Sequence, residues 1–302
     1  MNRTKRTMIT LAGLASVTLA LTGCATSDQF DDSPEATSSI VVGSQDYYSN
    51  EIIAEIYAQA LEEAGYDITR DFRIGQREIY VQEIEDGNVD LFPEYSGPVL
   101  LAWDPQTTAR TTDDVYAALL EAVPEGLNIL DQSSATDQDT YVVTREFSET
   151  YGVTSIADLA DVPIPLTLGG NSEGEDRPNG PQGLEKYYGV SVGFTPIEDG
   201  GGPLTVKALK DNQVQLAIIY TASPEILDPD LVELEDPAGL FLASHVVPIA
   251  SDKLDAEAIA IINAISAALT PEGLIELNTQ SIQEESPAST IAAGWLAEHE
   301  LG

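Results

Sequence analysis

The feature that most constrains the fold is a regular alternation of strand-like and helix-like segments from residue 38 onward. Short β-rich runs, such as residues 38–43 and 139–144, alternate with segments whose apolar residues recur at helical spacing, such as residues 49–65 and 77–87. This alternation is typical of α/β proteins with mostly parallel strands. From about residue 252 the pattern is nearly all helical, so we expect α/β architecture closed by C-terminal helices.

Length and composition fit two modest lobes. The chain has 302 residues, of which 43% are apolar, enough for two hydrophobic cores. Acidic residues outnumber basic ones by 51 to 13, for a formal net charge of −38. Nucleic acid is excluded as a partner, because phosphate contacts require Lys and Arg. The charge predicts a solvated acidic surface that keeps the protein soluble.

The N-terminus has the layout of a secretory signal. Three basic residues precede a short apolar run that ends at Cys24, the only cysteine. The residues before it, Leu-Thr-Gly, resemble a bacterial lipobox, which implies that Cys24 is lipidated after residues 1–23 are removed. Residues 25–38 are small and polar and predict a flexible tether. We therefore expect a lipid-anchored protein on the extracytoplasmic face of the cell membrane.

An internal repeat relates two distant parts of the chain. Residues 81–95 and 206–220 align without a gap, with five identities that include Tyr95 against Tyr220. Each copy predicts a helix, a tight turn and a buried strand that ends in the tyrosine. Ligands bind outside the carboxyl ends of strands in open α/β sheets. The repeat therefore predicts two similar lobes that present a tyrosine to a shared cleft, with a turn expected at residues 96–98.

Enzyme motifs are missing from the sequence. There are only two histidines, and no G-x-S-x-G elbow, zinc-ligand spacing or Walker loop is present. The sequence therefore predicts a binding protein that is not an enzyme, with no cofactor and no metal.

Several segments together resemble a known family. The pattern includes IVVGSQ near residue 40, LFPEYSG at 91–97, DTYVVT at 139–144 and DRPNG at 176–180. It is similar to substrate-binding lipoproteins of ABC importers for glycine betaine, choline, carnitine and related quaternary amines. The resemblance spans residues 39–298. It implies two lobes that close on a small cationic or zwitterionic solute and deliver it to a membrane permease.

The resemblance also implies a tyrosine cage. Faces of aromatic rings attract a quaternary ammonium through their quadrupole, by about 0.5–2 kcal/mol per favourable contact. Tyr95, Tyr141 and Tyr220 fall on three ring positions of the family's cage. Asp139 falls where the family adds negative potential, and Arg177 where an arginine pairs with the ligand's carboxylate.

Further positions are polar or depart from the family pattern. Gln45 falls on a polar contact position in the first strand-to-helix loop, and Ser244 stands where a fourth aromatic is expected. Tyr47, Tyr48 or His245 are candidates to replace that ring. Pro98 stands where relatives often have a hydroxyl, and it cannot donate a hydrogen bond. Two alternatives stay open: a ligand bulkier than glycine betaine, or one that is not a quaternary amine.

The prediction is a monomeric, type II periplasmic-binding-protein-like chain. Each lobe is expected to be a mixed sheet flanked by helices, with two crossing segments between the lobes. Lobe 1 would comprise residues 39–137 and 242–302, and lobe 2 residues 138–241, after a lipidated tether at residues 24–38. The expected function is to capture a quaternary-ammonium compatible solute for an ABC importer that serves osmoprotection. The alternative keeps the fold but binds a different small ligand or serves as a sensory lipoprotein.

Overall fold

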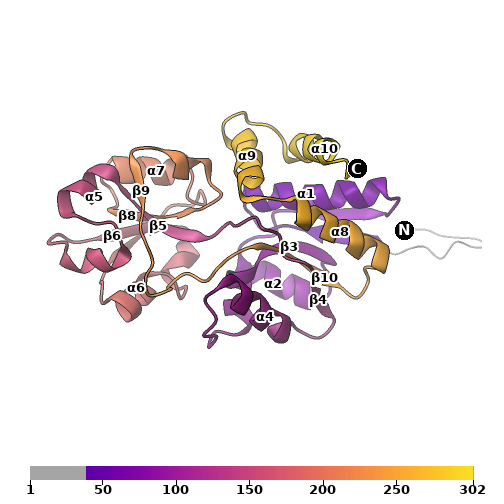
Figure 1. Cartoon of the computed structure of the whole chain (residues 1–302), viewed down its shortest axis with the longest axis horizontal. Coiled ribbons are helices and arrows are strands. Elements are labelled where there is room, and N and C mark those ends of the chain that lie inside the picture. Colours follow the sequence, from indigo (N-terminus) through magenta and orange to yellow (C-terminus); the bar gives the residue numbers. More distant parts are fainter. Residues whose placement is uncertain (1–38, 302) are drawn as a thin grey trace, which may run out of the picture. The chain divides into compact units, whose positions relative to one another are not determined.

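The strands divide between two five-stranded sheets (Figure 1). The computed structural model describes residues 39–301, so the predicted signal peptide, the predicted tether and Cys24 lie outside the described residues. The first sheet has the order β2 (Ile68–Asp71), β1 (Ile40–Gly43), β3 (Leu91–Tyr95), β10 (Val246–Ser251), β4 (Leu127–Ile129). The second has the order β7 (Gly193–Pro196), β6 (Thr167–Gly170), β8 (Leu216–Tyr220), β5 (Asp139–Thr144), β9 (Leu231–Glu233). We call the parts built on the two sheets lobe 1 and lobe 2.

The two sheets share one topology. In lobe 1, β3 pairs parallel with β1 and antiparallel with β10. In lobe 2, β8 pairs parallel with β6 and antiparallel with β5. The fourth strand of each sheet, β10 or β5, follows a segment that crosses from the other lobe. This arrangement confirms the expected α/β class with a mixed sheet in each lobe.

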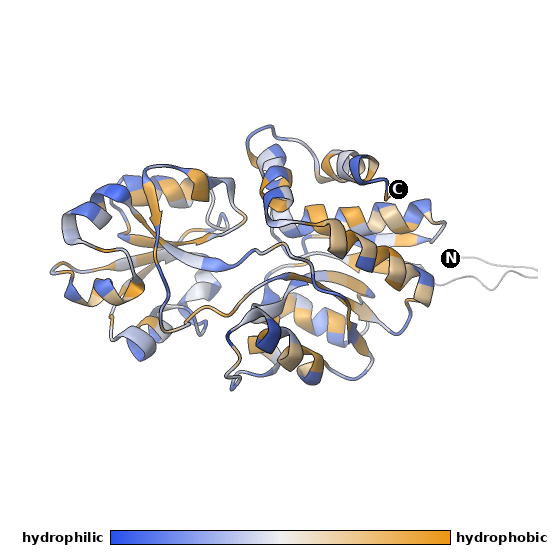
Figure 2. Ribbon diagram, viewed as in Figure 1, coloured by the Kyte–Doolittle hydropathy of each residue, from blue (hydrophilic) through white to orange (hydrophobic). Residues whose placement is uncertain are grey.

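Helices flank both sheets. In lobe 1 these are α1 (Tyr48–Glu63), α2 (Arg77–Glu85), α3 (Ser96–Trp103), α4 (Thr112–Ala122), α8 (Ala256–Ala268), α9 (Pro271–Ile282) and α10 (Ala288–His299). In lobe 2 they are α5 (Arg145–Tyr151), α6 (Pro181–Tyr188), α7 (Pro203–Lys210) and the short 3-10 helices η1 (Ile156–Asp161), η2 (Ser172–Glu175) and η3 (Pro224–Leu227). Hydrophobic residues are concentrated in the strands and in stripes along the helices, and many loops are hydrophilic, whereas part of the segment between β9 and β10 is hydrophobic (Figure 2).

The C-terminal helices complete the core of lobe 1. Apolar residues of α1 at helical spacing, including Ile52, Ile53 and Ile56, are fully buried. They belong to one hydrophobic cluster with Ile262 and Ile265 of α8. No single helix within residues 39–301 is long and apolar enough to cross a membrane; only α8 and α9 together have the required length and composition, and they are bent by 91°.

Two crossing segments join the lobes, one between β4 and β5 and the other between β9 and β10. They run side by side: Thr136 of the first forms an isolated antiparallel bridge with His245 of the second. The Ser244 hydroxyl also donates to the Asp137 carbonyl across 3.3 Å. The connection between the lobes is thus a pair of hydrogen-bonded segments, and Asp137 lies within it.

Residues 96–98 do not form the expected turn, so that prediction is wrong. Ser96 directly begins α3, with Tyr95 as the residue before its first turn. Pro98 fits there because the first turn of a helix leaves its backbone N–H groups without intrahelical partners. The strand therefore ends at Tyr95 because a helix starts.

Candidate functional site

A cavity of about 290 Å³ lies between the lobes. Its walls come from loops that follow β1, β2, β6 and β7, and from Tyr95 and Tyr220 at the ends of β3 and β8. The site thus forms where the carboxyl ends of strands from both sheets meet, as expected for open α/β sheets. Its volume lies near the lower end of the range for small-molecule sites.

A buried carboxylate fixes the backbone at Tyr95. Glu94 is fully buried and accepts hydrogen bonds from Arg77 Nε at 2.8 Å and from the Tyr80 hydroxyl at 2.5 Å. It also accepts a hydrogen bond from the backbone N–H of Tyr95. A buried charge must be paired and hydrogen-bonded to be tolerated. Glu94 therefore anchors both the tyrosine at the end of β3 and the arginine that begins α2.

Four tyrosines gather at one end of the cavity. Tyr47 and Tyr48 follow β1, Tyr95 ends β3, and Tyr220 comes from lobe 2. The rings of Tyr47 and Tyr48 are 4.7 Å apart, and those of Tyr47 and Tyr220 are 5.1 Å apart, both edge to face. Burial raises the pKa of all four hydroxyls, so the phenols stay neutral.

A glycine makes room for this cluster. Gly200 has φ +62°, a conformation that glycine adopts without strain, and a Cβ there would lie 3.3 Å from the ring of Tyr47 and 3.5 Å from that of Tyr220. The run of glycines at residues 200–202 thus brings lobe 2 backbone close to rings from both lobes.

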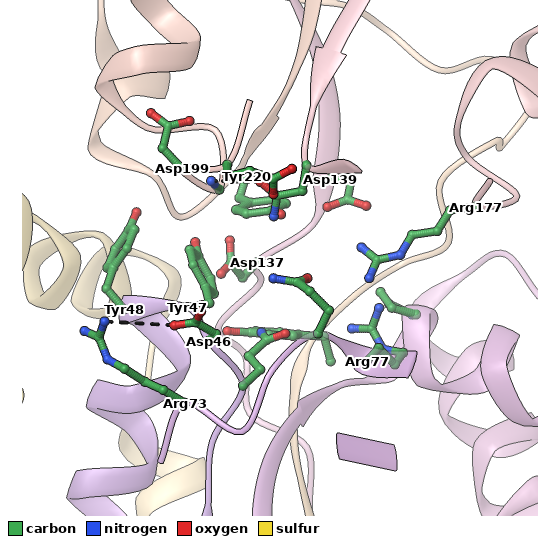
Figure 3. A pocket seen from close by; sticks show the side chains of 17 residues that line it. Asp46, Tyr47, Tyr48, Arg73, Arg77, Asp137, Asp139, Arg177, Asp199 and Tyr220 are labelled. Atoms are coloured by element: carbon green, nitrogen blue, oxygen red, sulfur yellow. Dashed lines mark hydrogen bonds and ion pairs between the residues drawn. The ribbon is translucent and has the colours of Figure 1, made fainter. Parts of the chain in front are cut away.

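Asp137 adds a buried carboxyl group next to the tyrosines. It is 5% exposed and lies in the first crossing segment (Figure 3). Its Oδ1 accepts a long hydrogen bond from the Ala222 N–H at 3.3 Å, while its Oδ2 has no partner within the described residues. Burial raises the pKa of Asp137 to about 7, and the Ala222 hydrogen bond offsets only part of that rise. A cation beside this group would hold it in its charged form.

The opposite end of the cavity carries arginines. Arg77 and Arg177 lie on the other side of the cavity from Tyr47 and Tyr48 (Figure 3). Arg177 of lobe 2 forms a two-pronged pair with Glu78 of lobe 1, with both N···O distances 3.1 Å. This pair joins the two lobes directly.

Asp139 lies close to both arginines. It accepts a hydrogen bond from Asn179 Nδ2 at 2.6 Å. Burial raises the pKa of Asp139, and Arg177 and Arg77 offset part of that rise.

The lining charges favour a positive ligand group. Five carboxyl groups and three guanidiniums line the cavity, namely Asp46, Asp137, Asp139, Glu198 and Asp199 against Arg73, Arg77 and Arg177. Each guanidinium also has a carboxylate partner, in Glu51, Glu94 and Glu78 respectively. A cation that enters therefore meets carboxylates and ring faces, and a ligand anion would have to share an arginine.

Five of the seven predicted ligand-binding residues line the cavity: Gln45, Tyr95, Asp139, Arg177 and Tyr220. Ser244 is buried and lines a neighbouring cavity instead. Tyr141 lines neither. It is fully buried in the core of lobe 2, where its hydroxyl donates to the Asn179 carbonyl and its ring packs edge to face on Phe241 at 4.9 Å. It does not reach the cavity in this structure, because it lies two residues inside the strand that begins at Asp139.

Sequence reasoning missed or underrated other residues at the site. Tyr47 and Tyr48 were only candidates for a replacement ring, although they directly follow the loop after β1, where strand ends meet. No sequence pattern marks Asp137 as a site residue, because a crossing segment has neither helical nor strand periodicity. Nothing in the sequence distinguishes Arg77 from any other first residue of a helix. Within residues 39–301, no group of three or more His, Cys, Asp or Glu side chains could hold a metal ion.

Two lobes of this topology, two crossings and a ligand-sized cavity define a type II solute-binding protein. The family model described as the substrate binding domain of ABC-type glycine betaine transport systems (OpuAC) matches residues 38–298. The chain belongs to this family, which confirms the resemblance, and it is a substrate-binding component of an ABC importer.

Similar proteins agree over most of the chain. It is 23% identical over 277 residues to the glycine betaine-binding protein YehZ of Escherichia coli, covering 87% of this chain and 91% of that protein. It is 24% identical over 280 residues to a glycine-betaine-binding protein of Pseudomonas aeruginosa, covering 86% of this chain and 88% of that protein. The fold matches a crystal structure titled glycine betaine/carnitine/choline ABC transporter, with a TM-score of 0.70 and 19% identity, covering 87% of this chain and 99% of that one.

Proposed function

We propose that the chain captures a quaternary-ammonium solute between its lobes, with the cationic head among Tyr47, Tyr48, Tyr95 and Tyr220. Glycine betaine, choline and carnitine are the candidate solutes, because they appear in the names of similar proteins. A trimethylammonium group has no N–H to donate, so ring faces and carboxylates are the groups that can stabilise it.

One observation carries this proposal: four neutral phenol rings and an underpaired buried carboxyl group face one end of one cavity. A hydrophobic core would not place the Asp137 carboxyl there without partners, because an uncompensated buried charge is costly. A ligand cation supplies the missing partner. Rings from both lobes take part, so ligand binding would favour the closed arrangement.

The arginine end would receive the ligand's other polar group. A carboxylate there would share Arg177 with Glu78, whose side chain is 54% exposed. Glu78 can return to water when a ligand carboxylate takes its place on Arg177, whose own side chain is 20% exposed, so this exchange is not costly. The proposal therefore accommodates both zwitterions, which use Arg177, and choline, which does not need it.

Calorimetric titration of the purified full-length chain tests the function. Choline, glycine betaine and carnitine are compared with 3,3-dimethyl-1-butanol, a neutral molecule with the shape of choline. Binding of at least one quaternary amine, with at least tenfold weaker binding of the neutral analogue than of choline, supports the cation site. If no quaternary amine binds at millimolar concentration, the proposal fails.

We further propose that a lipid at Cys24 anchors a monomer at the extracytoplasmic face, where it serves a membrane permease. The basic and apolar residues before Cys24 support this. In a bacterium that processes lipoproteins, wild-type chain should fractionate with membranes, and Cys24→Ser should not. Equal membrane association of both proteins would contradict the anchor.

A further inference from the structure

A second, smaller cavity adjoins the arginine end of the first. Its volume is about 130 Å³, close to that of an apolar cavity that binds benzene, about 150 Å³. It is lined by α3 of lobe 1, by the loop after η2 in lobe 2, and by the crossing segment between β9 and β10, which we call the return crossing segment. Much of its wall is apolar, including Leu101, Pro178, Leu240, Phe241 and Leu242.

The two cavities share a boundary. Arg77, Pro98, Asp139 and Arg177 line both. A ligand whose charged groups contact these arginines from the first cavity is therefore next to the second. Among the boundary residues, Pro98 has a side chain that is only hydrocarbon, and it has no backbone N–H. An apolar chain can pass Pro98 without leaving a protein hydrogen-bonding group on that residue unpaired.

The second cavity is unlike the first in chemistry. The first cavity is dominated by charged groups and tyrosines, whereas the second has an aliphatic and aromatic wall behind the arginine boundary. Its buried hydroxyl, on Ser244, is already used as a donor to the Asp137 carbonyl. A small polar ligand such as glycine betaine gains no binding free energy from this wall. An apolar substituent would gain the free energy of transfer from water to an apolar environment.

We propose that the second cavity is a subsite for the apolar chain of a larger quaternary-ammonium zwitterion. The ligand class has a trimethylammonium head, a carboxylate, and a short alkyl or acyl chain that passes Pro98 and contacts Leu101 and Leu242. This inference rests on the proposed function, because it places the charged head in the first cavity. It assigns the α3 face and the return crossing segment a role in ligand selection.

A homologous ligand series tests the subsite. Carnitine, O-acetylcarnitine and O-butyrylcarnitine share one charged head and differ in chain length. Burial of one methylene group contributes about fourfold in affinity, so O-butyrylcarnitine should bind the full-length chain roughly 15-fold more tightly than O-acetylcarnitine. Equal or weaker binding of the butyryl ester, while carnitine or glycine betaine binds, overturns the subsite and leaves the proposed function standing.

Substitutions in the second cavity then test where the ligand's apolar chain binds. Leu101→Trp fills the second cavity from a partly buried position, and it should reduce the butyryl-to-acetyl ratio to about one while carnitine affinity changes less than about twofold. Leu120→Trp, on an exposed position of α4, is the matched control and should keep the wild-type ratio. An unchanged ratio in folded Leu101→Trp overturns the assignment.

Pro98→Thr gives an independent variant in case Leu101→Trp does not fold. It places a hydroxyl on the shared boundary and should lower the butyryl-to-acetyl ratio at least threefold. If this variant keeps the wild-type ratio, the path past Pro98 is wrong. If no quaternary amine binds the wild-type chain, the proposed function and this inference both fall.

Discussion

Tyr95 and Tyr220 occupy equivalent positions in the two lobes. Each is the last residue of the third strand of its sheet, β3 or β8. Each also pairs with the first residue of the antiparallel strand that enters from a crossing segment, Val246 for Tyr95 and Asp139 for Tyr220. The internal sequence repeat therefore corresponds to a structural repeat, and both copies deliver a ring to the same cavity.

Loss of either ring should weaken ligand binding. Tyr95→Leu and Tyr220→Leu keep apolar volume but remove the aromatic face, so each should cost about 0.5–2 kcal/mol, or roughly 2- to 30-fold in choline affinity. Tyr→Phe at the same positions keeps the face and should stay within a few-fold of wild type. Calorimetric titration measures both. Equal loss in the Leu and Phe variants would mean that the hydroxyl, and not the ring face, is what matters.

Tyr141→Phe should separate stability from binding. The Tyr141 hydroxyl donates to the Asn179 carbonyl inside lobe 2, and Tyr141 itself lines neither cavity. Its removal should lower the free energy of unfolding by about 1 kcal/mol, seen in urea unfolding, while choline affinity remains unchanged. A tenfold loss of affinity would show that Tyr141 contacts the ligand after all.

Binding of choline should tighten as the pH rises through about 7. The raised pKa of Asp137 means that the ligand-free site holds a proton below about 7, and a bound cation favours the ionised form. Affinity should therefore be about tenfold weaker at pH 6 than at pH 8. Asp137→Asn should bind more weakly at pH 8 and lose this pH dependence. A wild-type profile that is flat from pH 6 to 8 would contradict the assignment.

Stability of the ligand-free protein should show the opposite trend. The pKa of Asp137 is raised from 3.8 to about 7, so the folded state holds the proton more tightly than the unfolded chain. The stabilising contribution is complete below about 3.8 and is lost as the pH rises through about 7. Asp137→Asn removes this titrating group. In urea unfolding, the variant should therefore become more stable relative to wild type as the pH rises from 5 to 8. A difference that does not change with pH would contradict the raised pKa.

Glu78→Gln should discriminate between ligands. The substitution frees Arg177 from its partner in the other lobe. Glycine betaine and carnitine should then bind up to about fivefold more tightly, since a pair whose carboxylate is exposed is worth about 1 kcal/mol or less. Choline, which has no carboxylate, is the control and should not gain. An equal change for choline and glycine betaine would point to lobe closure and away from carboxylate pairing.

The sequence predicted the architecture because periodicity reports burial directly. The alternating segments, the helical C-terminus and the repeat were enough to place Tyr95 and Tyr220 at strand ends. The error at Ser96 has a local cause: Ser-Gly-Pro is typical of a turn, yet it also suits the first turn of a helix, and α3 begins there.

From periodicity alone, site residues were predictable only where a strand end marks them; Arg177 was predicted from the family resemblance. Tyr141 shares the face of β5 with Asp139, since side chains alternate with period two. It lies about 7 Å further from the strand end, inside the core. Distance from the strand end, which the residue types do not reveal, decides between ligand contact and packing. Asp137 and Ser244 lie in the crossing segments, whose course depends on how the two sheets are joined.

A crystal structure of the chain with bound choline tests the central claim most directly. The quaternary nitrogen should lie within about 6 Å of the ring centroids of at least three of Tyr47, Tyr48, Tyr95 and Tyr220, with the Asp137 carboxyl facing it. Choline bound outside this cavity, or bound with its nitrogen at the arginine end, would contradict the account.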